Sequence, residues 1–260
     1  MWKNTVAVFI GKRSAIFLLA LIFSAAACVT LKKTGAYAVY YNVSLRKLPV
    51  YSVEREDKKI AISFDCAWGA EKTDELLRVT KEYGVKCTFF VTQFWAEKYP
   101  GYVEKIRSAG HDIGTHGATH SYMSKLSEDK IVNELETSCA AIEKITGEKV
   151  ILFRPPYGDY NDRLIKTCEK GGLYAIQWDV DSLDWKNVSA RDIASRVISR
   201  VKSGSIILCH NNAENTPEAL PEIFANLQGR GYEFVKISEL IYMENYTVDA
   251  DGRQRPAEKT

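Results

Sequence analysis

The chain has 260 residues, of which 46 % are hydrophobic and 26 % are charged, a composition typical of a globular protein with a substantial core. The formal net charge of +2 is too small to indicate nucleic-acid binding, and no basic stripe is interleaved with aromatic residues. Seven prolines and sixteen glycines leave no room for a long low-complexity linker.

Residues 1–33 differ from the rest of the chain. An apolar run spans 15–31 and has basic residues on both sides, namely Lys3, Lys12 and Arg13 before it and Lys32 and Lys33 after it. Its length suits a tilted membrane-spanning helix of roughly 17–25 residues, and the positive charge before it favours an inside amino terminus. We therefore expect an uncleaved transmembrane signal-anchor that carries an extracytoplasmic domain. The alternative is a cleaved signal peptide and a secreted domain, because small residues at 25–27 offer a cleavage-like site.

Short apolar runs alternate with amphipathic segments from Lys58 onward. We expect strands at Lys59–Phe64, Lys86–Thr92, Val150–Phe153, Tyr174–Trp178, Ser205–Leu208 and Glu233–Val235. We expect helices at Thr73–Tyr83, Tyr102–Ser108, Glu128–Thr146, Arg163–Lys170, Ala190–Lys202 and Pro217–Leu227. The segment 34–57 is expected to be a stalk or an edge strand, and 246–260 a C-terminal tail.

This alternation predicts parallel strands joined by crossover helices, and therefore an α/β domain. An open doubly wound sheet that binds dinucleotides is disfavoured, because no G-x-G-x-x-G follows the first strand. A somewhat short (β/α) barrel fits better, and such a barrel has its active site at the carboxyl ends of the strands.

Polar residues stand at these strand ends. Asp65 follows the first expected strand, Arg154 the third, and His210 the fifth, while Asp179 and Asp181 follow the fourth. Four strand ends that all carry polar groups are typical of a barrel active site and not of a solvated surface.

The chain has four histidines, and three of them lie within ten residues, at positions 111, 116 and 120. Because His116 and His120 are four residues apart, they can present two imidazoles to one metal ion. A metalloprotease of the H-E-x-x-H type is disfavoured, since Gly117 stands where that motif needs a glutamate. We expect His111 to be a structural histidine.

Five segments resemble, in order, the five motifs of the polysaccharide deacetylases, a family of carbohydrate esterases. They are S-F-D-C-A-W-G (63–69), H-G-A-T-H (116–120), R-P-P-Y-G (154–158), D-S-L-D-W (181–185) and L-C-H (208–210). The resemblance covers roughly 58–240 and implies a catalytic domain over 58–245 that folds as a distorted (β/α) barrel with about seven parallel strands. The A-W-G ending of the first motif and the H-N-N at 210–212 resemble a sporulation-associated subgroup.

The resemblance also implies a role for each matching residue. Asp65 matches the general base that activates water, and His210 matches the general acid that protonates the leaving amine. Arg154 matches the arginine that keeps the catalytic aspartate ionised. Asp184 matches the carboxylate that raises the pKa of the catalytic histidine.

By the same resemblance, His116 and His120 hold a divalent metal that polarises the acetamide carbonyl and lowers the pKa of a water. Zinc is the expected metal, with cobalt or another divalent ion as the alternative. Trp185 and Leu208 are expected to wall the pocket for the acetyl methyl group, and Tyr157 to offer its backbone N–H to the oxyanion.

One residue departs from the family pattern. The family usually has two adjacent aspartates in its first motif, the second being a metal ligand, and here Cys66 stands in the second place. Cys66 could bind the metal as a thiolate, which would favour zinc. Otherwise the metal is held weakly by two histidines and water, or metal binding is lost.

The resulting prediction is a metal-dependent hydrolase that removes N-acetyl groups from cell-wall or spore-wall glycan, with peptidoglycan favoured over chitin-like polymers. It is expected to be a monomer at the cell surface or in the space around the forespore. The alternative is a catalytically impaired glycan-binding or spore-envelope protein on the same fold, because of Cys66.

Overall fold

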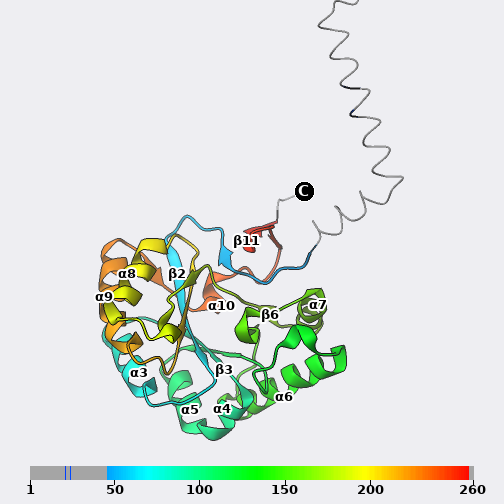
Figure 1. The fold of residues 1–260 in the computed structure, drawn as a ribbon, viewed down its shortest axis with the longest axis horizontal. Helices are drawn as coiled ribbons and strands as arrows, with labels where there is room; N and C mark the ends of the chain where they lie inside the picture. The colour runs from blue at the N-terminus through cyan, green and yellow to red at the C-terminus, as the bar shows by residue number, and fades with distance from the viewer. Residues whose placement is uncertain (1–20, 22–23, 25–45, 258–260) are drawn as a thin grey trace, which may run out of the picture. The chain divides into compact units, whose positions relative to one another are not determined.

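A sheet of parallel strands forms the centre of the domain (Figure 1). The computed structural model describes residues 46–257 and the isolated positions 21 and 24. The strands run in the order β6-β5-β4-β3-β2-β8-β7, every neighbouring pair is parallel, and β9 (Glu233–Phe234) pairs with the start of β2. Their bounds are β2 Lys59–Cys66, β3 Thr88–Val91, β4 Asp112–Thr115, β5 Leu152–Phe153, β6 Tyr174–Ala175, β7 Val180–Asp181 and β8 Ile206–His210.

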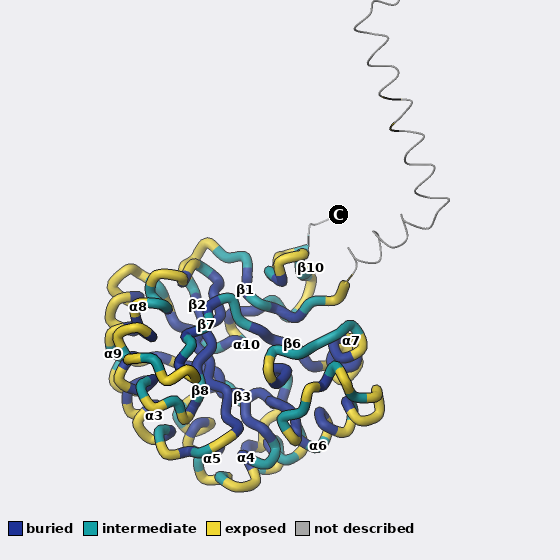
Figure 2. Tube along the Cα trace, viewed as in Figure 1, coloured by how far each residue is buried: buried dark blue, intermediate teal, exposed yellow. Residues whose placement is uncertain are grey.

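Helices connect the strands and cover the outer side of the sheet, with α8 and α9 beyond β2 and with α6 and α7 beyond β6 in Figure 1. Their bounds are α3 Thr73–Glu82, α4 Gln93–Lys98, α5 Pro100–Ser108, α6 Glu128–Thr146, α7 Asp162–Lys170, α8 Ala190–Arg200, α9 Thr216–Gly229 and α10 Ile237–Leu240. Figure 2 shows the strands as the buried interior and the outer sides of the helices as the exposed layer.

Side chains alternate between two layers along β2. Ile60, Ile62, Phe64 and Cys66 point into the large core between the sheet and the helices. The intervening Ala61, Ser63 and Asp65 point to the inner face. Because successive residues of a strand point to opposite faces, this one strand supplies both the packing under the helices and the polar groups of the inner face.

The terminal segments close the open side of the half-barrel. Val50 pairs with Ile176 next to β6, and the Val53 N–H donates to the Gly204 carbonyl before β8. A Cβ at Gly204 would overlap the Val53 carbonyl, so glycine permits this close approach. Strand β1 (Ser52–Val53) then pairs with β11 (Arg253–Pro256), which pairs with β10 (Tyr246–Val248). The predicted stalk therefore contains an edge strand, and the predicted C-terminal tail forms a strand pair.

The expected α/β architecture, a distorted barrel of about seven parallel strands, is confirmed. Strands β4 and β7 and helices α4 and α10 were not expected. Within the described part of the chain, no helix is long and apolar enough to cross a membrane. The predicted anchor over 1–33 lies outside the described residues except for positions 21 and 24.

Candidate active site

A cavity of about 920 Å³ opens at the carboxyl ends of the strands. Eight of the ten residues that we expected to form the site line it, namely Asp65, His116, His120, Tyr157, Asp184, Trp185, Leu208 and His210. Arg154 lies behind Asp65, and Cys66 points elsewhere. The cavity therefore brings together residues from all five motifs, which are up to 145 positions apart in the chain.

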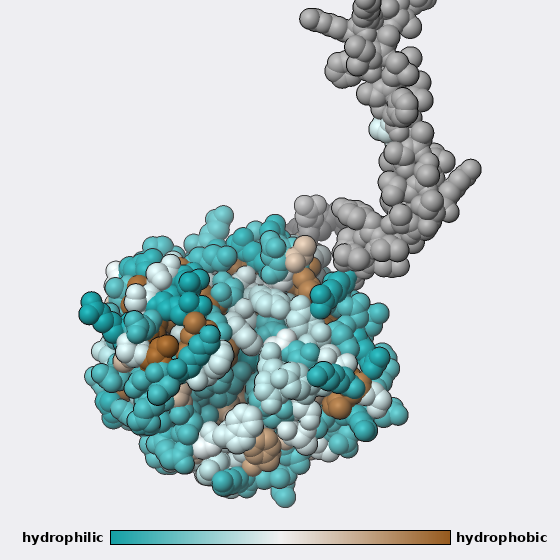
Figure 3. All heavy atoms as spheres, in the orientation of Figure 1, coloured by the Kyte–Doolittle hydropathy of each residue, from teal (hydrophilic) through white to brown (hydrophobic). Residues whose placement is uncertain are grey.

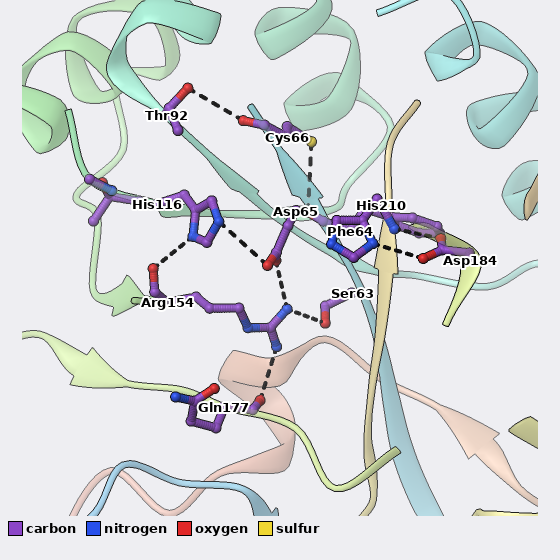
Figure 4. A network of polar contacts seen from close by, with 12 residues as sticks. Ser63, Phe64, Asp65, Cys66, Thr92, His116, Arg154, Gln177, Asp184 and His210 are labelled. Atoms are coloured by element: carbon purple, nitrogen blue, oxygen red, sulfur yellow. Dashed lines mark hydrogen bonds and ion pairs between the residues drawn. The ribbon is translucent and has the colours of Figure 1, made fainter. Parts of the chain in front are cut away.

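Asp65 is a buried carboxylate held by an arginine. Its Oδ1 lies 2.8 Å from Arg154 Nη1, and the guanidinium also donates to Ser63 Oγ at 2.8 Å and to the Gln177 carbonyl at 3.0 Å (Figure 4). The guanidinium stacks on Phe90, with 4.2 Å from Cζ to the ring centroid. Burial alone would raise the pKa of the Asp65 carboxyl, but the charge and hydrogen bond of Arg154, together with the nearby imidazoles of His116 and His210, outweigh burial and the pKa is lowered. Asp65 is therefore an ionised base.

His210 enters the cavity from β8 and is held by Asp184. Asp184 Oδ1 accepts from His210 Nδ1 at 2.7 Å, and Oδ2 accepts from the His210 backbone N–H and from Thr216 Oγ1, each at 2.7 Å. Burial lowers the pKa of His210, but the hydrogen bond and the charge of Asp184 outweigh it, so the pKa is raised. The raised pKa favours the protonated form of His210, which lies opposite the Asp65 carboxylate on the neighbouring strand.

His116 and His120 lie together at the end of β4. Their ring centroids are 4.9 Å apart. They sit on a loop and not on a helix face, because Gly117 and His120 have φ values of 79° and 57°. His116 Nδ1 lies 2.7 Å from the Arg154 carbonyl, which requires a proton on Nδ1 and leaves Nε2 with a lone pair, 3.5 Å from Asp65 Oδ2.

The chemistry of these two imidazoles fits a divalent cation. Burial lowers the pKa of both histidines, that of His120 to about 4, so both rings are neutral at physiological pH. His120 Nδ1 is a buried nitrogen without a hydrogen-bond partner in the structure. Neutral imidazole nitrogens are ligands that zinc and related cations prefer. Among the residues that the structure describes, no set of three or more His, Cys, Asp or Glu side chains is arranged to hold a metal.

Glu134 fastens the histidine loop to helix α6. Its Oε2 accepts from the Ala118 and Thr119 backbone N–H groups at 2.8 and 2.9 Å, and its Oε1 accepts from Thr119 Oγ1 at 2.6 Å. The carboxylate is buried. Three hydrogen bonds donated to one carboxylate hold the chain between His116 and His120, so Glu134 fixes how the two rings face each other.

Cys66 lies on the opposite side of β2 from Asp65. Its Sγ is 3.7 Å from the Phe64 carbonyl, and the side chain packs in the core under the helices (Figure 4). Burial raises the pKa of the Cys66 thiol well above its usual value. This placement favours a protonated thiol in the core over a thiolate on a metal, because a thiol must be deprotonated to bind one. The described cysteines are all free, and all of them except Cys139 are buried.

Tyr157, Trp185 and Leu208 occupy the walls of the cavity. Tyr157 has a φ of 59°, and its ring packs edge-on against His120 with 4.5 Å between centroids. The expected contacts of Trp185 and Leu208 with the acetyl methyl group, and of the Tyr157 N–H with the oxyanion, remain predictions.

His111 is a structural histidine as expected, since its Nδ1 accepts from the Cys87 N–H at 3.0 Å and burial lowers its pKa to about 4.

The fold and the site are those of a hydrolytic enzyme, with an aspartate, a histidine pair and a second histidine gathered at the mouth of an incomplete (β/α) barrel. A family model described as polysaccharide deacetylase matches residues 52–176. A peptidoglycan-N-acetylglucosamine deacetylase of Bacillus cereus is 34 % identical over 196 residues, which cover 74 % of this chain and 92 % of that protein. The chain belongs to the polysaccharide deacetylase family.

Solved structures of this family have the same fold. A peptidoglycan N-acetylglucosamine deacetylase bound to a small molecule superposes with a TM-score of 0.72 at 30 % identity and covers 74 % of this chain and 91 % of that one. A wild-type pseudoenzyme of carbohydrate esterase family 4 (CE4) from Bacillus anthracis gives a TM-score of 0.73 at 29 % identity and covers 80 % of this chain and 72 % of that one. The family therefore contains both deacetylases and a protein described as a pseudoenzyme.

Three residues of the site were not expected from the sequence. Ser63 and the Gln177 carbonyl orient Arg154, and Glu134 orients the histidine loop. Ser63 lies two residues before Asp65, so strand alternation could have placed it on the same face. Glu134 occupies the same helix face as Ile131 and Leu135, and an acid at a core-facing position is a signal that could have been used.

Proposed function

We propose that the protein removes N-acetyl groups from the glycan strands of peptidoglycan. The observation that carries the proposal is the pairing of an ionised Asp65 with a protonated His210 across one cavity, beside the two neutral imidazoles of His116 and His120. Amide hydrolysis needs a base for the attacking water and an acid for the leaving amine. The similarity to a Bacillus cereus protein named as a peptidoglycan-N-acetylglucosamine deacetylase supports peptidoglycan as the proposed substrate.

The residues of the chain divide the proton transfers between them. Asp65 takes a proton from the attacking water, and Arg154 keeps its carboxylate ionised before the reaction. His210 gives the proton on Nε2 to the departing nitrogen, while Asp184 holds its Nδ1–H. Tyr157 would donate its backbone N–H to the developing oxyanion. Trp185 and Leu208 would enclose the acetyl methyl group and exclude water from it.

Deacetylases of this family are generally metal-dependent, and we propose zinc as the cation for this chain. His116 and His120 would hold it through their neutral rings, in agreement with the unpartnered Nδ1 of His120. A divalent cation in this position supplies a Lewis acid for the acetamide carbonyl and lowers the pKa of a water.

We also propose that the domain works outside the cytoplasmic membrane, tethered by the apolar segment within residues 1–33. Peptidoglycan lies there, so the location agrees with the substrate. Membership of the sporulation-associated subgroup remains a prediction from the sequence motifs at 63–69 and 210–212.

Release of acetate tests the proposal directly. Full-length protein in mild detergent would be loaded with zinc or cobalt, incubated with purified peptidoglycan or with N-acetylglucosamine oligomers, and assayed for acetate. We expect acetate from the wild type and none above background from Asp65→Asn. If the wild type and Asp65→Asn release the same background amount of acetate with every metal, the deacetylase function is overturned.

The competing function is a glycan-binding protein with an impaired site. It is favoured by one feature, since Cys66 replaces the usual ligand aspartate and its thiol packs in the core. The similarity to a CE4 family pseudoenzyme agrees with it. This function would be favoured over catalysis if the metal-loaded protein sediments with peptidoglycan but releases no acetate from it.

A further inference from the structure

The amino end of helix α9 reaches the carboxylate that holds His210. Thr216 is the first residue of α9, and its Oγ1 donates to Asp184 Oδ2 at 2.7 Å. The face of the domain drawn in Figure 3 is mostly hydrophilic, but Thr216 and Asp184 lie beneath the surface, with 0 % and 2 % of their area exposed. Water therefore does not compete for this hydrogen bond, which strengthens it.

The backbone around Asp184 needs contacts from other elements. The 3₁₀ helix Asp184–Lys186 is flanked by Leu183 and Asn187, whose φ values are 60° and 55°. Left-handed backbone is uncommon for residues other than glycine and persists where the surrounding structure imposes it. The start of α9 supplies such contacts, because Asn215 Nδ2 donates to the Val188 carbonyl at 2.9 Å and the next residue donates to Asp184.

The two oxygens of Asp184 have different partners. Oδ1 accepts from His210 Nδ1, while Oδ2 accepts from the His210 backbone N–H and from Thr216 Oγ1 (Figure 4 shows the carboxylate facing the His210 ring). The negative charge of a carboxylate is shared by its two oxygens, so each donor on Oδ2 draws charge away from Oδ1. The Thr216 hydroxyl therefore limits how strongly Asp184 stabilises the protonated imidazole.

We propose that Thr216 is a positioning residue that adjusts the acid strength of His210 through Asp184. An acid that holds its proton too firmly transfers it slowly to a leaving amine, whereas one that holds it too weakly is not protonated when it is needed. The role of His210 as that acid rests on the proposed function. The effect of the Thr216 hydroxyl on the His210 proton does not, since it follows from the hydrogen bonds alone.

Other charged groups also face His210. Asp65 on β2 and Asp181 on β7 favour the protonated form, as Asp184 does, while burial disfavours it. His116, beyond the end of β4, would oppose it only when protonated itself. These groups are the same in every variant of Thr216, so a shift in the titration of His210 reports the loss of the hydroxyl.

The His210 imidazole can be followed directly by NMR in full-length, metal-free protein with ¹³C-labelled histidine in mild detergent. The chain has four histidines, and the signal of His210 is the one that is missing from His210→Gln. Thr216→Val is expected to raise the pKa of His210 by about half a unit, since only part of the roughly one to two units that a hydrogen bond to a charged group is worth reaches Nδ1. Thr216→Ser keeps the hydroxyl and is expected to titrate as the wild type does.

Thr73→Val is the matched control. Thr73 is also buried at the first position of a helix, α3, but its Oγ1 has no hydrogen-bond partner in the described part of the chain. Its loss should leave the pKa of His210 unchanged. Thermal unfolding shows whether each variant is folded. If Thr216→Val is not, Thr216→Ala takes its place with the same expectation, because it removes the hydroxyl without setting a methyl group against the carboxylate.

A pKa of His210 that is unchanged or lowered without the Thr216 hydroxyl overturns the proposal, and so does an equal rise in Thr73→Val. A hydroxyl that only packed, or only kept Asp184 in place, would not raise it when removed. In protein that releases acetate, the alkaline limb of kcat/KM should move to higher pH in Thr216→Val, and a limb that stays in place also overturns the proposal. An absence of acetate from metal-loaded wild type overturns the proposed function alone, and the NMR titration still decides the role of Thr216.

Discussion

Asp65 and His210 stand directly opposite each other as paired residues of two adjacent parallel strands, β2 and β8. Paired residues of a parallel ladder project from the same face of the sheet, so both side chains enter the cavity. Each is held from behind by a buried residue of opposite charge, Arg154 for Asp65 and Asp184 for His210. The base and the acid can therefore be perturbed separately by changing the residue behind each.

Arg154→Met is expected to lower the free energy of unfolding by about 3–5 kcal/mol, because it leaves the buried Asp65 carboxylate without its partner. The measurement is urea unfolding at pH 7. Asp65→Asn in the Arg154→Met background removes the unpaired charge and should recover part of the loss. A loss below about 1 kcal/mol in the single variant would show that the ion pair does not compensate buried charge.

Asp184→Asn is expected to move the alkaline limb of the activity profile to lower pH. The pKa of His210 is raised because Asp184 outweighs the effect of burial, so the acid form is present up to that raised pKa and is lost above it. Without the carboxylate, His210 loses the hydrogen bond and the charge of Asp184 while burial still lowers its pKa, so the pKa falls. The measurement is kcat/KM for acetate release as a function of pH. An alkaline limb at the same pH in both proteins would exclude His210 as the group that titrates.

The same pair predicts how stability depends on pH. A group whose pKa is raised in the folded protein stabilises it fully below the unfolded pKa, near 6.5 for histidine, and this stabilisation is lost as the pH rises through the folded pKa. The difference in unfolding free energy between the wild type and Asp184→Asn should therefore be larger at pH 5.5 than at pH 9. Thermal or urea unfolding at the two pH values measures it.

The strands that could be predicted from the sequence are those with apolar runs, such as β2 and β8. Strand β4 escaped prediction because D-I-G-T has one large apolar residue and a central glycine. The structure explains that glycine, since a Cβ at Gly114 would lie 2.7 Å from the Phe90 ring. Strand β7 has only two residues in a polar run, Val180 and Asp181. Its pairing with β8 depends on a long-range contact that has no local pattern.

The residues that line the cavity could be predicted because their types and their positions at strand ends suit the proposed chemistry. Arg154 and Asp184, which hold Asp65 and His210, were predicted as well. The roles of Ser63, Gln177 and Glu134 were not predicted, because Ser63 and Gln177 contact Arg154 from 91 and 23 positions away and Glu134 contacts Ala118 from 16 positions away. The side on which Cys66 lies follows from the strand. β2 continues through Asp65 to Cys66, and the alternation of a strand then places the two residues on opposite faces.

Cys66→Ala is expected to leave zinc stoichiometry and affinity unchanged and to cost about 1 kcal/mol of stability, because it removes a small buried group from the core under the helices. Metal analysis after dialysis, competition with a chromophoric chelator, and urea unfolding give the three quantities. A loss of bound zinc in Cys66→Ala would instead make the sulfur a ligand and would require β2 to turn at its end.

Glu134→Gln is expected to weaken zinc binding by about 10- to 100-fold, the usual range for residues that orient metal ligands. The amide replaces one carboxylate oxygen with an N–H donor, so it can no longer accept all three hydrogen bonds that fix the loop at Ala118 and Thr119. The measurement is zinc affinity by chelator competition, which does not depend on turnover.

Glu136→Gln is the matched control, since it makes the same change at an exposed position of the same helix and should bind zinc as the wild type does. Thr119→Val removes one of the three hydrogen bonds and should give an intermediate affinity. If the wild type binds zinc and Glu134→Gln binds it equally well, the loop holds His116 and His120 without the carboxylate. If both variants at positions 134 and 136 weaken zinc binding equally, the effect reflects the loss of negative charge and not the position of the loop.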